Sequence, residues 1–206
     1  TMSEPAGHEL AWFADVATMS DLLSNLRQRT KSEWVVVPAR RNQLLLVNTD
    51  ASESEWSTFL DVIEDAFRYH SVVYPVPHII VDGQWVERIF DDPTDVGRRL
   101  RRLRVAARHQ TYEEIPALLR EQTGCEMASF EVMASDIDDS HSVPETYSIA
   151  YVDTNSAATS VPATDLLVFR SDTGSIFVTS FSLMECLPRL YQRQEGVYPP
   201  RFLVPH

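Results

Sequence analysis

The ten residues HIIVDGQWVE, numbered 78–87, decide how the first half of the chain folds. Asp82 and Gly83 separate two runs rich in β-branched and aromatic residues, and both accept the positive φ angles of a two-residue type I′ turn. A turn of this length fixes the register of the two strands. The expected cross-strand pairs are Val81 with Gln84, Ile80 with Trp85, Ile79 with Val86 and His78 with Glu87. The stretch therefore predicts an antiparallel β-hairpin.

The residues before this hairpin predict a short helix and a second hairpin. Residues 20–30 carry a short apolar stripe, and Ser20 is placed to cap its N-terminus. Residues 33–39 and 43–49 are apolar runs joined by three polar residues, a pattern that is typical of two paired strands.

A core helix is expected over residues 51–70. It begins with a Ser52–Glu55 capping box, in which each side chain can bond to the other residue's backbone N–H group. The apolar residues that follow recur at helical spacing, so one face of this helix should be buried.

An arginine-rich helix is expected after residue 91. Residues 98–108 hold six arginines in a chain whose net charge is −12. Asp92 suits the N-cap and Pro93 suits the first helical position. Four apolar residues fall on one stripe of the helix and should face the core: Val96, Leu100, Leu103 and Ala107.

The opposite side of this helix is expected to form a cationic surface. Its members are Arg98, Arg101, Arg102, Val105 and Arg108, with Arg99 and Arg104 flanking the apolar stripe. A solvated surface with weak ion pairs is one interpretation. A binding surface is the other, because charge is segregated: between Arg120 and Arg170 the chain has nine acidic residues and no basic one.

The second half of the chain predicts a helix, four strands and a closing helix. The expected segments are a helix over 111–124 with a Thr111–Glu114 capping box, strands over 126–134, 146–153, 165–170 and 175–182, a helix over 183–196 and an extended tail. Polar loops are expected over 135–145 and 154–164.

These segments define an α+β fold class, with antiparallel sheets and flanking helices. The expected order is α-β-β-α-β-β-α followed by α-β-β-β-β-α. A boundary near residue 110 would divide the chain into 1–110 and 111–206, either as two small domains or as parts of one continuous domain.

The composition excludes several classes of protein. A hydrophobic content of 44% is typical of a globular chain, and no apolar run is long enough to cross a membrane as a helix. The two cysteines, Cys125 and Cys186, lie far apart in sequence, so a disulfide scaffold or a zinc site is not expected. Because the N-terminus also lacks the pattern of a signal peptide, a cytoplasmic location is expected.

One acidic segment has the composition of a metal site. Within SDIDDSH, residues 135–141, the side chains of Asp136, Asp138 and Asp139 offer the hard oxygen ligands that Mg²⁺ and Ca²⁺ prefer, and His141 is near. The glycine and the final glutamate of a calcium loop are missing. Turn chemistry alone explains this segment more simply.

Motifs for catalysis are scarce in the rest of the sequence. His78 and Glu87 should face each other across the hairpin, where they could serve acid–base chemistry or form an ordinary cross-strand pair. The sequence contains no GxSxG, HExxH or Walker motif, and its six glycines argue against a phosphate-binding loop.

These features favour a non-enzymatic bacterial protein that binds other proteins, in the manner of an immunity protein, a secretion chaperone or an adaptor. The expected contact residues are Arg98, Arg101, Arg102, Val105 and Arg108, and the partner is another protein or a second copy of the chain. No cofactor is expected. One alternative is a divalent-metal-dependent hydrolase or nuclease that uses Asp136, Asp138 and Asp139. Another is nucleic-acid binding through the arginine-rich helix, which the acidic net charge disfavours.

Overall fold

The structure is a computed structural model with an α+β fold, and it divides into two compact units, Thr1–Ala107 and Arg108–His206. It describes residues 13–40, 42–68, 73–90, 94–114, 116–135, 145–154, 158–174, 176–180 and 191–205. None of the helices within these ranges is long and apolar enough to cross a membrane. The division between the units falls inside one helix, and whether the units are separate domains stays a prediction.

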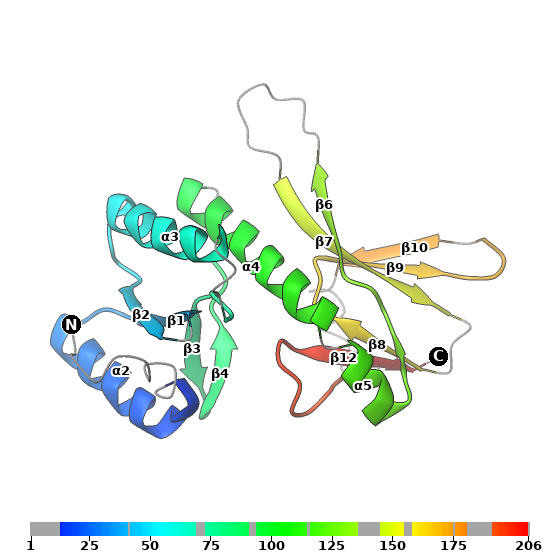
Figure 1. Cartoon of the computed structure of the whole chain (residues 1–206), viewed down its shortest axis with the longest axis horizontal. Coiled ribbons are helices and arrows are strands. Elements are labelled where there is room, and N and C mark those ends of the chain that lie inside the picture. The colour runs from blue at the N-terminus through cyan, green and yellow to red at the C-terminus, as the bar shows by residue number, and fades with distance from the viewer. Residues whose placement is uncertain are drawn as a thin grey trace. The chain divides into compact units, whose positions relative to one another are not determined.

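The first unit contains a four-stranded antiparallel sheet in the order β2-β1-β3-β4. Its elements are α2 (Val16–Thr30), β1 (Trp34–Arg40), β2 (Gln43–Asn48), α3 (Glu53–Arg68), β3 (His78–Val81), β4 (Gln84–Glu87) and the first part of α4 (Asp95–Glu114). Figure 1 shows α2 and α3 on opposite sides of this sheet. The main core of the unit joins β1 and β2 to α3 and α4, through residues such as Val35, Val47, Leu60 and Leu103.

The hairpin of β3 and β4 has the predicted register at all four pairs. Asp82 and Gly83 form the turn with φ angles of 50° and 73°, which are the positive values that the type I′ turn requires. His78 also pairs with Val36, so the hairpin joins the sheet through β3. The short-range turn signal therefore predicted both the register and the partners.

The helix starts of the first unit were predicted in part. The Ser52–Glu55 capping box is confirmed, because Glu55 Oε2 accepts from the Ser52 backbone N–H at 2.8 Å. The cap expected at Ser20 is wrong, since α2 begins four residues earlier. Asp15 is its N-cap and accepts from the Thr18 backbone N–H at 3.1 Å.

The arginine-rich helix, α4, is longer than the sequence indicated. It begins at Asp95, where the Thr94 hydroxyl oxygen accepts from the Gly97 backbone N–H at 3.2 Å, so the cap is not Asp92. It continues to Glu114, and a capping box at Thr111 is therefore wrong, because Thr111 lies within the helix. The apolar stripe expected to face the core is confirmed: Leu100, Leu103 and Ala107 are buried, Val96 packs against the core cluster of Leu100 and Leu103, and Ala107 packs in a second cluster with Tyr74 and Val76.

The second unit contains two four-stranded sheets of mixed direction, ordered β10-β9-β7-β6 and β11-β12-β8-β5. Its elements after α4 are α5 (Pro116–Thr123), β5 (Glu126–Met127), β6 (Glu131–Ser135), β7 (Glu145–Asp153), β8 (Ala158–Pro162), β9 (Leu166–Arg170), β10 (Ile176–Ser180), β11 (Gln192–Arg193) and β12 (Arg201–Pro205). β5 pairs with β8, and β7 pairs with β9, in the parallel direction. One apolar cluster joins the two sheets through Ala150, Val152, Leu167, Val161 and Val204.

Three sequence expectations for this unit are corrected. The loop expected over 154–164 contains strand β8, and the tail expected after residue 196 contains strand β12, which pairs with β8 over five residues. The single strand expected over 126–134 is two strands, β5 and β6. The closing helix falls mostly on residues 181–190, outside the described ranges, and β11 occupies part of its expected end.

Arg201 lies fully buried within the second unit. Its Nε donates to Ser160 Oγ at 2.9 Å, and its Nη2 donates to the carbonyl oxygens of Ser160 and Ala128 at 2.8 and 3.2 Å. Ser160 Oγ in turn donates to Gln194 Oε1, and the guanidinium lies 5.3 Å from the centre of the Tyr112 ring. Burial lowers the pKa of Arg201 to about 10. These neutral acceptors let one cation tie β12 to β8 and to the segment after β5.

Replacing Gly83 with Ala should lower the free energy of unfolding by about 1–2 kcal/mol, because a Cβ atom disfavours the left-handed φ of 73°. Asp82→Asn is the matched control and should change stability by less than about 0.5 kcal/mol, since Asn tolerates this conformation. Urea unfolding of the three proteins measures both values. Equal stability of Gly83→Ala and the parent protein would contradict the turn assignment.

Candidate functional site

The arginine-rich helix holds one arginine that serves the fold of the first unit. Arg99 has a side chain that is only 10% exposed. Its Nε and Nη2 each donate to a carboxylate oxygen of Glu64 at 2.9 Å, and Nη2 also contacts Asp61. Nη1 donates to Ser57 Oγ at 2.9 Å. Hydrogen bonds to Glu64 and Asp61 raise the pKa of Arg99, so this cation joins α4 to α3 and is not available to a partner.

Other arginines of α4 also have contacts within the chain. Arg108 Nη1 donates to the Ala163 carbonyl oxygen at 2.9 Å, and Arg98 Nη2 lies 3.8 Å from Asp95 Oδ1. Arg101 and Arg102 are half-buried. Partner binding by these arginines stays a prediction. Their side chains differ in exposure and in their contacts within the chain.

Val105 does not lie on an exposed cationic surface, and that expectation is wrong. Its exposed fraction is 2%. Tyr112, seven positions further along α4, is also buried, at 3% exposure. Residues seven apart lie on nearly the same side of a helix, so α4 has a second buried line beside the predicted apolar stripe. A residue without solvent exposure cannot be the apolar centre of a docking surface on this helix.

The acidic segment with Asp136, Asp138, Asp139 and His141 lies outside the described residues. A metal site there stays a prediction. Within the described part of the chain, no group of three His, Cys, Asp or Glu side chains is placed to hold a metal ion.

His78 lies at the centre of an aromatic cluster in the first unit, opposite Glu87 as the hairpin register predicted. The ring centres of Phe13, Tyr74 and Trp85 lie 5.3, 5.8 and 6.3 Å from that of His78. Trp85 stacks on Phe13, and its Nε1 donates to the Phe13 carbonyl oxygen at 2.8 Å. The Tyr74 hydroxyl donates to Glu87 Oε1 at 2.6 Å. The cluster fixes the imidazole in one place.

This arrangement supports packing better than acid–base catalysis. His78 has no exposed surface, so a substrate in solution cannot reach its ring. Burial lowers the pKa of His78 to about 4, although the negative charge of Glu87 opposes that shift. A neutral imidazole among aromatic rings is therefore a core residue of the first unit at physiological pH.

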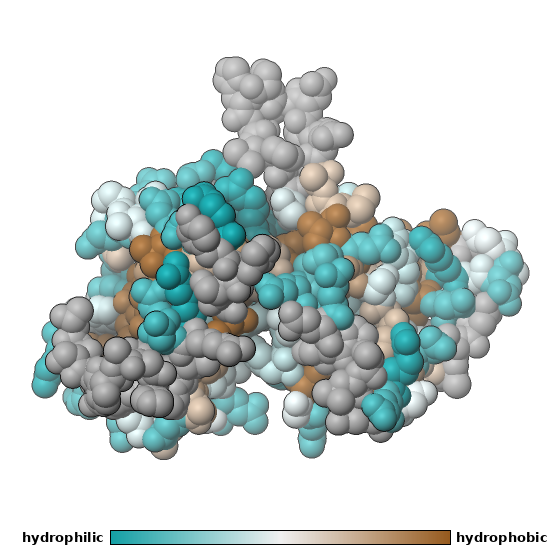
Figure 2. Space-filling view, viewed as in Figure 1, coloured by the Kyte–Doolittle hydropathy of each residue, from teal (hydrophilic) through white to brown (hydrophobic). Residues whose placement is uncertain are grey.

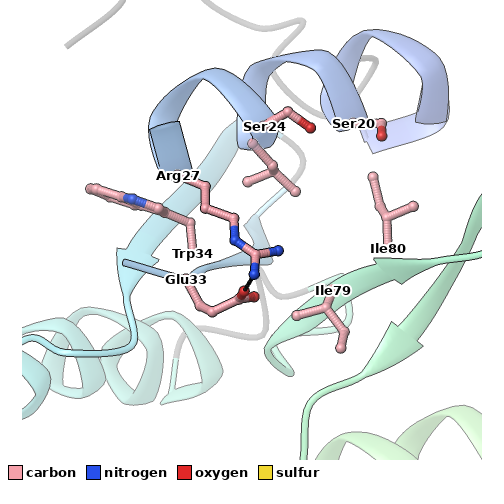
Figure 3. A pocket seen from close by; sticks show the side chains of 8 residues that line it. Ser20, Ser24, Arg27, Glu33, Trp34, Ile79 and Ile80 are labelled. Carbon is pink, nitrogen blue, oxygen red and sulfur yellow. Dashed lines mark ion pairs between the residues drawn. The ribbon is translucent and has the colours of Figure 1, made fainter. Parts of the chain in front are cut away.

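A small pocket lies between α2 and the sheet of the first unit. Its lining residues are Ser20, Leu23, Ser24, Arg27, Glu33, Trp34, Ile79 and Ile80, and its volume is about 120 Å³. Figure 3 shows Arg27 reaching from α2 to Glu33, with which it forms an ion pair at 2.9 Å. This volume suits a few water molecules or one short side chain, and it is well below the roughly 300–1,000 Å³ of small-molecule sites.

A wider charged groove follows one side of α3. Arg40 and Arg68 both lie within 4 Å of Asp65, at 3.6 and 3.5 Å, and the groove has a volume of about 570 Å³. Asp61 and Glu64 also line it, and Arg99 pairs with both of these carboxylates. Opposite charges already neutralise each other in this groove, so it offers no concentrated charge to a ligand.

The most exposed apolar surface belongs to β10 in the second unit. Ile176, Phe177 and Val178 are 68%, 63% and 52% exposed. β10 pairs with β9 on one side, and no described strand lies on its other side. Figure 2 shows brown, apolar atoms at several places on the visible surface of the molecule. We call the three exposed apolar residues of this outer strand, Ile176, Phe177 and Val178, the β10 edge.

The sequence predicted β10 as a strand but not as an edge. An uncharged run with three successive apolar residues is typical of a strand that is buried on both faces. Its position at the end of the sheet depends on the parallel pairing of β7 with β9, which is a long-range contact. One feature of the sequence could have indicated an outer strand. The run follows directly after the polar turn at residues 171–174, and the second strand of a hairpin is often at the edge of a sheet.

His78 should make the free energy of unfolding depend on pH. Its folded-state pKa of about 4 lies below the ordinary value of 6.5, so the unfolded chain binds a proton first as the pH falls. The contribution of neutral His78 to the free energy of unfolding is fully present above pH 6.5. It should decrease by about 3 kcal/mol as the pH falls from 6.5 to 4. Chemical unfolding across this window should show a smaller decrease for His78→Phe. If the free energy of unfolding changed equally with pH in the parent protein and in His78→Phe, His78 would not be buried in its neutral form.

Replacing Arg99 with Met should lower the free energy of unfolding by about 1–3 kcal/mol, because charge-assisted bonds to Glu64 and Asp61 are lost. Arg102→Met is the matched control on the same helix and should change stability by less than about 0.5 kcal/mol. Thermal and urea unfolding compare the two variants. A smaller effect of Arg99→Met than of Arg102→Met would contradict the role assigned to Arg99.

The chain matches no protein-family model, no curated protein and no solved structure.

Proposed function

We propose that this chain is a non-enzymatic protein that acts by binding other proteins, in the manner of an immunity protein, a secretion chaperone or an adaptor, and that the β10 edge is its main contact surface. The single observation that carries the proposal is the exposure of three successive apolar side chains on this strand. Exposed apolar surface that is contiguous is typical of protein-interaction sites.

The apolar side chains of β10 offer a partner contacts on both faces of the sheet. The side chains of a strand alternate between the two faces of the sheet and supply specificity. In β10, Phe177 lies on the same face as Phe169 of β9, with ring centres 6.2 Å apart, and Val178 lies on the other face. A bound partner would therefore contact apolar side chains on both faces.

The β10 edge is held rigidly before any partner binds. Five successive residue pairs join it to β9, and Thr179 near its end is 7% exposed. A surface that is ordered in advance loses little conformational entropy on binding. The strand thus combines exposed apolar side chains with a backbone that is paired to β9.

The arginine-rich helix fits this proposal as a secondary surface. Arg98 is exposed and the side chain of Arg102 is half-buried, whereas Arg99 serves the fold. Charges at the margin of a contact change the association rate and its salt dependence more than they change affinity. The exposed arginines of α4 therefore suit a role in the rate of association with a partner.

A contact surface at the β10 edge predicts that charge on this strand abolishes partner binding. Ile176→Lys/Val178→Lys places two cations on the edge, at positions more than half exposed, so the fold should be retained. Tagged parent and variant chains are used to capture proteins from a lysate of the source cells, and the bound chains are quantified by mass spectrometry. Proteins lost with the variant are then tested with purified components.

Met133→Lys on β6 is the matched control, because Met133 is also an exposed apolar residue, at 39%, on the other outer strand of the same sheet. It should retain the bound proteins. Identical sets of captured chains for the parent protein and both variants would contradict a binding role for the β10 edge.

A further inference from the structure

We infer that the β3–β4 hairpin opens in mild acid, because protonation of His78 releases it from β1 and from Phe13. The opening is local: the hairpin moves, whereas β1, β2 and α3 stay folded. This conformational change belongs to the first unit and is independent of the contact surface proposed on β10.

The backbone joint between the hairpin and the rest of the sheet is short. Among the described residues, β1 and β3 pair only at Val36 and His78, whereas β1 pairs with β2 at six positions and β3 pairs with β4 at four. Just before β3, the N–H groups of residues 73 and 74 donate to carbonyl oxygens of β1 at 3.3 Å. These bonds hold the incoming segment, so His78 is the point at which the hairpin leaves β1.

Beyond His78, side-chain contacts hold the hairpin. The 120 Å³ pocket lies here, with Trp34 of β1 and with Ile79 and Ile80 of β3 in its lining (Figure 3). Ile79 also packs against the main core. On the other strand, Trp85 stacks on Phe13, with ring centres 4.2 Å apart, and its Nε1 donates to the Phe13 carbonyl oxygen at 2.8 Å. Side-chain contacts of this kind can open without unfolding the whole unit.

The imidazole of His78 contacts both attachments of the hairpin. His78 supplies the backbone pair with β1, and the rings of Phe13 and Trp85 surround its side chain. The residue has no exposed surface. A charged imidazolium is stabilised by water, and in this structure water reaches the ring only if the hairpin moves away from Phe13.

The charges around His78 favour this movement once the ring is protonated. Among the described residues, the charged group that faces His78 is Glu87, across the hairpin, and the titratable phenol is Tyr74, which donates to Glu87. Phe13, Trp85 and Val36 bring no charge. Glu87 attracts the imidazolium, but the cost of burial is larger, so the pKa of His78 falls to about 4.

The size of the effect follows from the two pKa values of His78. In the open hairpin the ring is in water, where its ordinary pKa is 6.5, and in the closed hairpin the pKa is about 4. The open form therefore binds the proton more tightly. The equilibrium constant for opening should rise about tenfold for each pH unit between 6.5 and 4, or about 300-fold in total. Above pH 6.5, His78 should not affect it.

The experiment is native-state hydrogen exchange of the full chain, followed by NMR, between pH 6.5 and pH 4. The reporter is the indole N–H group of Trp85, which bonds to Phe13, and Trp85→Phe assigns its signal. Corrected for the intrinsic exchange rate, its protection should fall about 300-fold across this range. Added urea, kept below the unfolding transition, should change its protection little, because a local opening exposes little surface. Backbone amides of β1 and β2 should depend steeply on urea.

Two variants show whether His78 causes the effect. His78→Gln cannot titrate, so the pH dependence of Trp85 protection should be lost. His109→Gln is the matched control, because His109 is a partly exposed histidine of α4 that lies 3.5 Å from Glu113, and it should keep the full pH dependence. If His78→Gln does not fold, the carbon signals of the imidazole in the parent protein report the titration directly. Their midpoint should lie near pH 4.

Four results would overturn the inference. Trp85 protection that is independent of pH would show that opening does not expose His78. A pH dependence that His78→Gln retains would assign it to another group. A urea dependence as steep as that of the β1 and β2 amides would show that the hairpin opens only when the whole unit unfolds. A His78 titration near pH 6.5 would show that the ring meets water in the closed hairpin.

Discussion

The two-residue turn at Asp82 and Gly83 is the constraint on which the first unit depends. Because strand side chains alternate between faces, a shift of one residue in this register would exchange the two faces of the hairpin. The observed register places Ile79 against the core beside α3 and places His78 and Trp85 in the aromatic cluster with Phe13. The imidazole is buried among aromatic rings, and burial lowers its pKa, so it is neutral at physiological pH.

The arginine-rich helix shows how far helical periodicity carries a prediction. A spacing of 3.6 residues correctly identified the apolar stripe that faces the core. The same spacing could not predict the burial of Val105. A sequence pattern does not show that other residues also cover a second side of the helix. The fate of Arg99 was also not predictable, since it depends on Glu64 and Asp61 of a distant segment. An arginine side chain is buried at the edge of a core only where another helix or strand supplies hydrogen-bond acceptors for its guanidinium group.

The second unit was predictable in class and only partly in detail. β8 was missed because Thr159 and Ser160 resemble loop residues in sequence, whereas the structure buries both. The Ser160 hydroxyl is stable in this buried position because it accepts a hydrogen bond from Arg201 and donates one to Gln194. The parallel pairing of β7 with β9 was also missed, since a strand's partner is set by long-range contacts. The same reason hid the candidate site: β10 was predictable as a strand, but its place at the sheet edge was not.

The described outer strands of the other sheets differ from β10 in length, charge and exposure. In the sheet with β8, the outer strands β5 and β11 are two residues long, too short to accept a stable addition. In the first unit, β4 ends with Glu87, and the side chains of β2 are at least partly buried. Natural sheets protect their edges by short length, charge, proline or coverage. β10 has five residues, no charge and no proline, and its apolar side chains are more than half exposed. Among the described outer strands, β10 therefore has the fewest of these protections, which is the physical reason for proposing it as a contact surface.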